Sequence, residues 1–508
     1  MGNTNKSLYK IAGIALLLFM FVFMCYDAAK QSFWFDELDW TVAYVAKSNL
    51  FDMLRALSEK GYNLPLYYIV LFPVYKIVPY GELWLLLPNF FAIILGIYFL
   101  RKTGHIIGGE DLGFCSLCFA VFSYVLICDA GYELRPYAFL FLFSTLALYR
   151  FICLLQEGSR KNQILYTLSI VLLSYTHWFG CLIIVFYFLI DAARYICKKV
   201  SLTMIWPYIC LGIFFFPWFV MILVNNQINM LDYWSTYPFL YDVILTIKYL
   251  LSYNSLCIYL LILGVLCFLL YALSKRTKET MYQGICVGSI IWVIGTIFIY
   301  SRFINPGGSL YVQRYFLVLL PHIFILMAIP LIELLHFEIK INERKLKIEI
   351  NGFPLDKKIA LLLVAVIVGS IGASNYLQVH RSAMSIYEPY RELSDIIVKE
   401  DAVYQDDGAL VTSDGIAYLT YYFAKRGYPV PPNVYRGSDK LEHVVVKEGN
   451  FDPIPCETSE LLKYNTLYVF EVHAFFEDHM WEFIDENYEL RSRDDEISLY
   501  IYERKGAF

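Results

Sequence analysis

The segment Phe33–Trp40, with the sequence FWFDELDW, directly follows the first hydrophobic run of the chain. It places the carboxylates of Asp36, Glu37 and Asp39 among aromatic side chains. Charge is costly beside hydrocarbon, so acidic residues at a membrane boundary usually have a function. A solvated loop face or the start of a helix is the alternative interpretation of the same three residues. The rest of the sequence helps to decide between a functional site and a structural role for these acidic residues.

The composition predicts an integral membrane protein. The chain has 508 residues, of which 58% are hydrophobic and 18% aromatic, which is more than a soluble domain carries. A helix that crosses a bilayer needs about 17–25 mostly apolar residues. Eleven runs meet this requirement, and they are expected at 8–29, 83–101, 112–128, 136–155, 164–178, 179–198, 203–225, 255–273, 281–301, 315–336 and 358–379.

The apolar segment Leu64–Pro79 is expected to form a helix that lies in the membrane interface, within the first external loop. It is short and carries Lys76. If this segment crossed the membrane, every later loop would change sides. The basic residues of the membrane portion would then gather on the wrong side.

The distribution of lysine and arginine predicts the orientation of the chain in the cell membrane. With the N-terminus in the cytoplasm, the cytoplasmic side of the membrane portion carries 19 basic residues and the opposite side nine. Cytoplasmic loops are enriched in basic residues. We therefore expect a multi-pass protein with a cytoplasmic N-terminus and an extracytoplasmic C-terminal domain.

A change of charge along the chain predicts a domain boundary near residue 380. Residues 381–508 carry 25 acidic and 13 basic residues, whereas residues 1–380 carry 21 acidic and 28 basic. We expect a membrane domain over 1–380 and a small α/β domain over 381–508. In the second domain the patterns predict strands at Gly408–Ser413, Leu467–Phe470 and Leu499–Tyr502, and helices at Ile416–Lys425 and Phe475–Tyr488.

Further polar residues fall on the same external side as the acidic segment. They lie at the mouths of predicted helices and are Glu133, Arg135, His177, Arg302 and Arg314. Arginines at helix ends often extend toward lipid headgroups, and a histidine can belong to an aromatic belt, so each residue has a structural explanation alone. Together they indicate an external pocket at headgroup level, where arginines could hold a lipid phosphate beside carboxylates.

The sequence requires no cofactor. Its 12 cysteines show no metal-ligand spacing. A divalent metal ion would be compatible with three neighbouring carboxylates, although no spacing demands one. Membrane lipids are expected partners and nucleic acid is not.

The membrane portion resembles the bacterial relatives of the protein O-mannosyltransferases, in the GT-C superfamily that also includes the aminoarabinose transferases. The likeness is carried by short motifs in the family's order, namely Asp36-Glu37 in the first external loop, Asn63–Tyr68, Gly81–Pro88, Arg135-Pro136-Tyr137, and Gln313–Phe316 followed by Pro321. Two positions depart from the family pattern. Asn63 stands where relatives often have His or Lys, and Leu87 replaces an arginine that is usual before Leu-Pro.

The resemblance implies a mainly α, GT-C-like membrane protein that transfers a sugar, with inversion, from a polyprenyl-phosphate donor. The acceptor would be an envelope glycan, lipid or protein on the extracytoplasmic side. It implies Asp36 as the general base, assisted by Glu37. The expected substrate-binding residues are Arg135, Arg314, His177, Glu133, Asn63 and Tyr67.

Two alternatives to this function remain open at the level of sequence. A ligase or polymerase would move a whole lipid-linked glycan rather than one sugar. A flippase or transporter of lipid-linked sugars would not be an enzyme, and transporters bind near the bilayer midplane.

Overall fold

The computed structural model describes most of the chain, namely residues 2–30, 32–60, 63–199, 201–225, 238–274, 277–305, 310–335, 339–340, 349–352, 357–384, 390–413, 416–437, 441–447, 450–471, 476, 478–495 and 497–506. The chain forms two compact units. The first unit comprises Met1–Ala29, Val45–Ile77 and Leu83–Ser382, and the second comprises Lys30–Tyr44, Val78–Glu82 and Ala383–Phe508.

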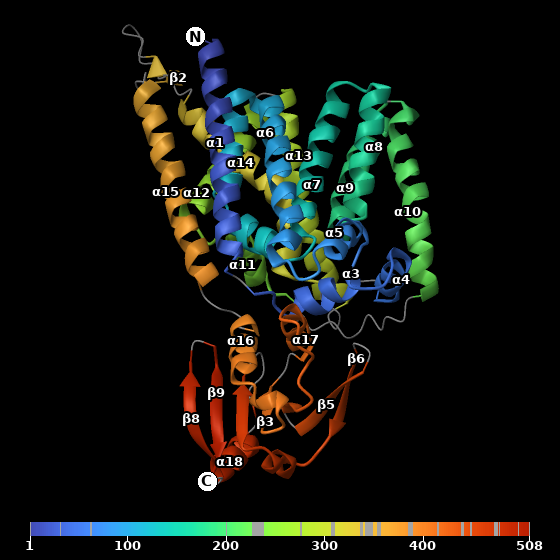
Figure 1. Cartoon of the computed structure of the whole chain (residues 1–508). Coiled ribbons are helices and arrows are strands. Elements are labelled where there is room, and N and C mark those ends of the chain that lie inside the picture. The colour runs from blue at the N-terminus through green and yellow to red at the C-terminus, as the bar shows by residue number, and fades with distance from the viewer. Residues whose placement is uncertain are drawn as a thin grey trace. The chain divides into compact units, whose positions relative to one another are not determined.

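The first unit is a bundle of long apolar helices that run side by side in Figure 1. Within the described ranges, nine helical stretches are long and apolar enough to cross a bilayer. They contain α1 (Gly2–Ala28), α6 (Glu82–Val121), α7 (Tyr137–Gln156), α9 (Trp178–Ile196), α10 (Trp206–Asn225), α12 (Ser255–Ser274), α13 (Lys278–Ile299), α14 (Leu320–Leu335) and α15 (Lys357–Met384). The predicted multi-pass, mainly α architecture is confirmed.

The difference between eleven predicted spans and nine long helices has two sources. First, α6 bends back at Gly108 and Gly109, and Gly109 has a φ of 87°, which glycine adopts without strain. Arg101 and Glu110 form an ion pair of 3.3 Å across this bend, so α6 contains two of the predicted spans. Second, α8 (Arg160–Ser174) has only 15 residues, so it falls short of a full span.

The loop after α1 contains short helices, as expected. They are α2 (Phe35–Glu37), η1 (Leu38–Val42), α3 (Ala43–Val45), α4 (Leu50–Lys60) and α5 (Leu66–Ile77). The 12 residues of α5 extend over about 18 Å, which is too short for a hydrocarbon core of about 30 Å.

The remaining elements of the first unit are η2 (Leu126–Tyr132), η3 (Leu202–Ile205), α11 (Leu240–Leu250), η4 (Tyr300–Ile304), η5 (Gln313–Leu319), β1 (Ile339–Lys340) and β2 (Glu349–Gly352).

The second unit contains a mixed seven-stranded sheet with the order β6-β5-β4-β3-β7-β9-β8. Only the central strand β3 pairs in parallel with its neighbours β4 and β7, and the other pairs are antiparallel. The strands are β3 (Gly408–Thr412), β4 (Val434–Gly437), β5 (Leu441–Lys447), β6 (Asn450–Pro455), β7 (Thr466–Phe470), β8 (Tyr488–Asp494) and β9 (Leu499–Arg504). The helices are α16 (Tyr390–Glu400), α17 (Ile416–Lys425) and α18 (Asp478–Asn487), with short turns η6 (Ala402–Tyr404) and η7 (Thr458–Lys463).

The predicted α/β character of the C-terminal region is confirmed. Strands β3, β7 and β9 lie where they were expected, and α17 has its predicted bounds. The core of the domain is formed by buried side chains of the central strands and α18, including Val411, Leu467, Val469 and Met480. The inclusion of residues 30–44 and 78–82 in this unit was not predicted.

The close contact between α12 and α14 provides a test of the bundle. Gly264 of α12 is buried, and a Cβ built on it would overlap the backbone carbonyl of Leu326 in α14. We expect Gly264→Ala to destabilise the protein by about 1–3 kcal/mol, because an added methyl group has no room there. Thermal unfolding of the detergent-solubilised protein measures this effect.

Gly295→Ala is the matched control. Gly295 lies inside α13, and beyond its chain neighbours and its own helix backbone no heavy atom lies within 4 Å of its added Cβ. Alanine is the better helix former, so this variant should unfold at the wild-type temperature or above. Equal melting temperatures for the two variants would contradict the proposed contact between α12 and α14.

Candidate functional site

The candidate site of the first unit lies at the end of the bundle where the chain leaves α1. The side chain of Met24, near the end of α1, packs against Gly131 of η2. The chain returns to this end of the bundle at the start of α5, because Leu66 N–H donates to the carbonyl oxygen of Tyr175 at 3.0 Å. The end of α1 therefore lies beside η2, and the start of α5 lies beside the α8–α9 turn.

An arginine–glutamate pair forms the centre of this cluster. The guanidinium Nη1 of Arg314, in η5, lies 3.7 Å from Oε2 of Glu133, and the two side chains are 18% and 20% exposed. The Arg314 guanidinium also lies 5.9 Å from the ring centre of Tyr137, at the start of α7. The carbonyl oxygen of Glu133 accepts hydrogen bonds from Asn89 and from the N–H of Arg135. Arg135 is only 8% exposed.

His177 joins this cluster from the start of α9. Its Nδ1 accepts the N–H of Phe179 at 3.2 Å, so His177 caps the helix. Its ring packs against those of Tyr315, at 4.9 Å, and Tyr137, at 6.0 Å. Burial lowers the pKa of His177 to about 3, and the charges of Arg135 and Arg314 act in the same direction. The imidazole is therefore neutral at physiological pH.

The sequence prediction missed two residues of the cluster. The hydroxyl of Tyr249, in α11, donates to Oδ2 of Asp129, in η2, at 2.7 Å. Burial raises the pKa of Asp129, against the opposing effects of the Tyr249 hydrogen bond and the Arg314 charge. One feature of the sequence could have identified Asp129. It is an isolated acidic residue at the end of an apolar run, four residues before Glu133.

Two other predicted substrate-binding residues lie in or near α5. Tyr67 is fully buried, and its ring packs edge-on against Phe139 at 5.3 Å. Asn63 is half-buried and lies three residues before α5. Their roles toward a substrate remain predictions.

The acidic segment belongs to the second unit. Glu37 is 2% exposed, and its Oε2 accepts the N–H of Trp34 at 2.7 Å, so this carboxylate fixes the turn that contains it. Asp36 is half-buried and therefore presents more of its surface than Glu37 does. The structure thus brings Glu133, Arg135, His177 and Arg314 together in one unit, and Asp36 and Glu37 in the other.

Among the side chains that the structure describes, no group of three or more His, Cys, Asp or Glu residues could hold a metal ion. The Asp39 side chain lies outside this set. A divalent ion at the acidic segment therefore remains an expectation from sequence.

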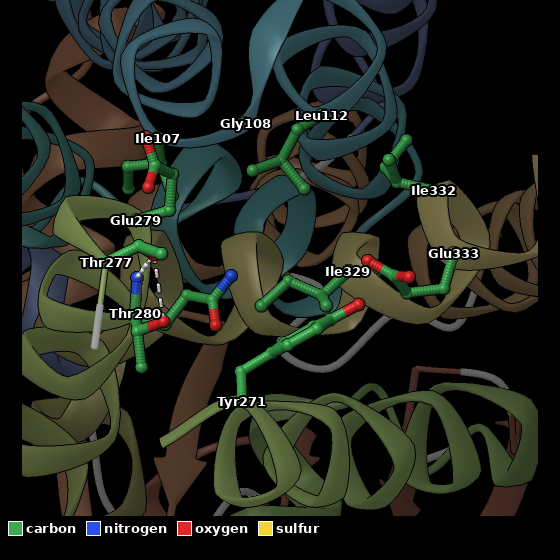
Figure 2. A pocket seen from close by; sticks show the side chains of 11 residues that line it. Ile107, Gly108, Leu112, Tyr271, Thr277, Glu279, Thr280, Ile329, Ile332 and Glu333 are labelled. Carbon is green, nitrogen blue, oxygen red and sulfur yellow. Dashed lines mark hydrogen bonds between the residues drawn. The ribbon is translucent and has the colours of Figure 1, made fainter. Parts of the chain in front are cut away.

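A cavity of about 240 Å³ lies at the opposite end of α13, among α6, α12, α13 and α14. Figure 2 shows the Tyr271 hydroxyl directed toward the Glu333 carboxylate. The Thr277 hydroxyl accepts the N–H of Thr280 and caps α13. These polar groups thus have structural roles at helix ends.

The neutral state of His177 leads to a prediction about pH. Since the pKa of His177 is about 3 in the folded state and about 6.5 in an unfolded chain, the unfolded state takes up the proton first as the pH falls. This histidine should therefore reduce stability by up to about 1.4 kcal/mol per pH unit below pH 6.5. Asparagine is also a good helix cap but does not titrate. We expect wild type to lose stability relative to His177→Asn between pH 6.5 and 5, measured by thermal unfolding.

Above pH 7 the stability difference between the two proteins should not depend on pH. A constant difference from pH 7.5 to pH 5 would show that His177 has an ordinary pKa in the folded state.

No protein-family model and no curated protein matches this chain. The chain is similar in structure to ArnT from Cupriavidus metallidurans. It matches the apo structure with a TM-score of 0.57 and 13% identity, and the undecaprenyl phosphate-bound structure with a TM-score of 0.53 and 12% identity. Each match covers 98% of this chain and 98% of ArnT. A more distant match, with a TM-score of 0.45, is the archaeal oligosaccharyltransferase AglB from Archaeoglobus fulgidus.

The ArnT match extends through both the helix bundle and the C-terminal sheet. The GT-C fold that the sequence motifs predicted is therefore confirmed, and this chain has the fold of ArnT over nearly its whole length.

Proposed function

We propose that this protein is a membrane glycosyltransferase that transfers a sugar from a polyprenyl-phosphate donor to a cell-envelope acceptor. One ArnT structure with the same fold holds undecaprenyl phosphate. The observation that carries the proposal is the cluster of Arg135, Arg314 and Glu133 at the end of the bundle where α1 ends and α5 begins. The reaction would take place on the extracytoplasmic side and would invert the anomeric centre.

The charge of the first-unit cluster suits a phosphate. Arg135 and Arg314 supply two permanent positive charges, because a guanidinium stays protonated at any physiological pH. Glu133 balances one of them. His177 is neutral, and the Asp129 carboxylate is held by the Tyr249 hydroxyl. A guanidinium can bind two phosphate oxygens at once, so the two arginines suit the phosphate of a lipid donor.

The chemistry needs one base and a stabilised leaving group. The oxygen of an acceptor hydroxyl attacks the anomeric carbon, and its proton passes to the Asp36 carboxylate. The bond between the anomeric carbon and the phosphate oxygen breaks, and its electron pair leaves with the polyprenyl phosphate. The two arginines stabilise the negative charge that develops on this phosphate. No general acid is required, because the phosphate leaves as a stable anion.

The other predicted residues have supporting roles in this proposal. Glu37 is engaged with its own backbone and would orient the acidic turn rather than accept the proton. Glu133 would hold Arg314 in place until the lipid phosphate arrives. The neutral His177 and the half-buried Asn63 would contact the sugar or the acceptor by hydrogen bonds. The buried Tyr67 would support the floor of the site.

Asp36→Asn tests the assignment of the base. We expect it to reduce sugar transfer by at least about 10²–10⁴-fold, because a carboxamide cannot accept the proton. The assay incubates purified protein with a panel of undecaprenyl-phosphate-linked sugars and an envelope fraction, and measures the release of undecaprenyl phosphate. Glu59→Gln is the control, since Glu59 is an exposed acid of the same loop whose partner is Arg55. Half of wild-type turnover in Asp36→Asn would exclude Asp36 as the base.

Arg314→Gln tests the phosphate site separately from the base. Removal of this charge should weaken binding of undecaprenyl phosphate by about tenfold or more, since hydrogen bonds to charged groups contribute about 1.5–3 kcal/mol. Binding can be measured by titration into the purified protein. Arg150→Gln is the control, because the guanidinium of Arg150 also stacks on a tyrosine of α7, Tyr149, at 5.0 Å. Equal affinities for the two variants would contradict the phosphate site.

A further inference from the structure

The acidic segment is packed into the C-terminal domain. Residues 30–44 and 78–82 belong to the same compact unit as residues 383–508. Loops of this kind are usually the most mobile parts of a protein. In this protein, hydrogen bonds, an ion-pair cluster and ring contacts hold the two loop segments in the second unit.

The first contact fixes the backbone just before Asp36. Phe33 N–H donates to the hydroxyl oxygen of Tyr422 at 2.6 Å, and both residues are buried. The Phe33 ring also packs against Tyr421, with ring centres 5.8 Å apart. The next N–H along the chain, that of Trp34, is bound by Glu37. Two successive backbone donors next to Asp36 are therefore held, one of them by a side chain of the C-terminal domain.

The second contact fixes the other loop segment. Oε2 of Glu82 lies 2.8 Å from Arg391 and 2.7 Å from Lys425, and Glu82 is only 9% exposed. The ring of Tyr80 packs against Tyr421 at 5.5 Å, so the ring of Tyr421 lies against both loop segments.

The parts of the C-terminal domain that make these contacts are themselves joined. Arg426, directly after α17, donates to Asp395 and to the carbonyl oxygen of Arg391, both in α16. It also donates to the carbonyl oxygen of Tyr422. Arg426 thus joins the two helices that contact the loop segments.

We propose that α16 and α17 hold the acidic loop in its working geometry and that Tyr422 is a positioning residue for Asp36. This inference rests on the proposed function. A base acts efficiently only when its carboxylate stays within hydrogen-bond reach of the proton that it accepts. An error of about 1 Å in the position of such a group can reduce the rate by about 10²-fold. The C-terminal domain therefore serves the reaction by reducing the motion of the loop, without touching the substrate.

A purely structural role of Tyr422 is the competing explanation. Tyr468 provides the matched control, because it is also fully buried in the C-terminal domain, and its hydroxyl donates to Glu400, the last residue of α16, at 3.1 Å. None of the described contacts of these two residues reaches residues 30–44 or 78–82. Tyr422→Phe and Tyr468→Phe each remove one hydrogen-bonded hydroxyl and keep the ring. Glu82→Gln is a second test variant, which weakens the ion pairs of the other loop segment.

The experiment combines two measurements on the full-length protein. Hydrogen–deuterium exchange detects the motion of residues 32–44 without any substrate. Steady-state kinetics, with whichever undecaprenyl-phosphate-linked sugar the wild type turns over, separates kcat from KM.

We expect exchange in residues 32–44 to become faster in Tyr422→Phe and Glu82→Gln and to stay at the wild-type rate in Tyr468→Phe. We expect kcat to fall by about tenfold in Tyr422→Phe, as for the loss of one buried hydrogen bond, with KM for the lipid donor unchanged.

Unchanged exchange in Tyr422→Phe, or equal losses of kcat in the two tyrosine variants, would overturn the inference. If the wild type releases no undecaprenyl phosphate from any donor, the proposed function fails instead. The exchange data then still decide whether the C-terminal domain holds the loop.

Discussion

The structure depends on how its charged groups are accommodated next to hydrocarbon. A buried charge without hydrogen bonds or a partner costs several kcal/mol, so such groups are held in fixed arrangements. Arg314 is paired with Glu133, Asp129 accepts the Tyr249 hydroxyl, and Glu37 binds its own backbone. In the first unit, the contacts of Arg314 and Asp129 concentrate polar groups at the end of the bundle near η2, on a helix scaffold that is mostly apolar. A preorganised polar cluster of this kind stabilises developing charge without having to rearrange.

In the proposed function, the two chemical tasks fall to different units. The first unit offers guanidinium groups beside a neutral imidazole, which suits the phosphate of a lipid donor. The second unit carries the acidic turn, fixed by Tyr422 on one side and by Glu37 on the other. In the proposed reaction, the base thus belongs to the second unit and the phosphate site to the first. This division explains why a membrane enzyme of this kind would keep a C-terminal domain that contains none of its proposed reacting groups.

Elements whose pattern is local were predictable from the sequence. The helix Ile416–Lys425 shows regular apolar spacing, and its predicted bounds agree with those of α17. The bend in α6 at Gly108 and Gly109 likewise falls between the expected spans 83–101 and 112–128. By contrast, α8 has only 15 residues and is shorter than the span expected at 164–178. Strand β8 is exposed at all but its first residue and lacks the alternation that marks a half-buried strand, so it was missed.

The candidate site was predictable only in part, for a related reason. Charged residues at helix mouths stand out in an apolar sequence, which is how Glu133, Arg135 and Arg314 were found. The partner of Asp129, by contrast, lies 120 positions away in α11, and that of Phe33 lies 389 positions away in α17. Contacts of this kind arise from tertiary packing, and no local pattern encodes them. The most direct test of the account is therefore a structure of this protein with undecaprenyl phosphate bound. We expect the phosphate to lie within about 3 Å of the Arg314 guanidinium and Asp36 to face the space where the sugar would sit. A phosphate bound away from both arginines, or an Asp36 carboxylate directed away from the lipid, would contradict it.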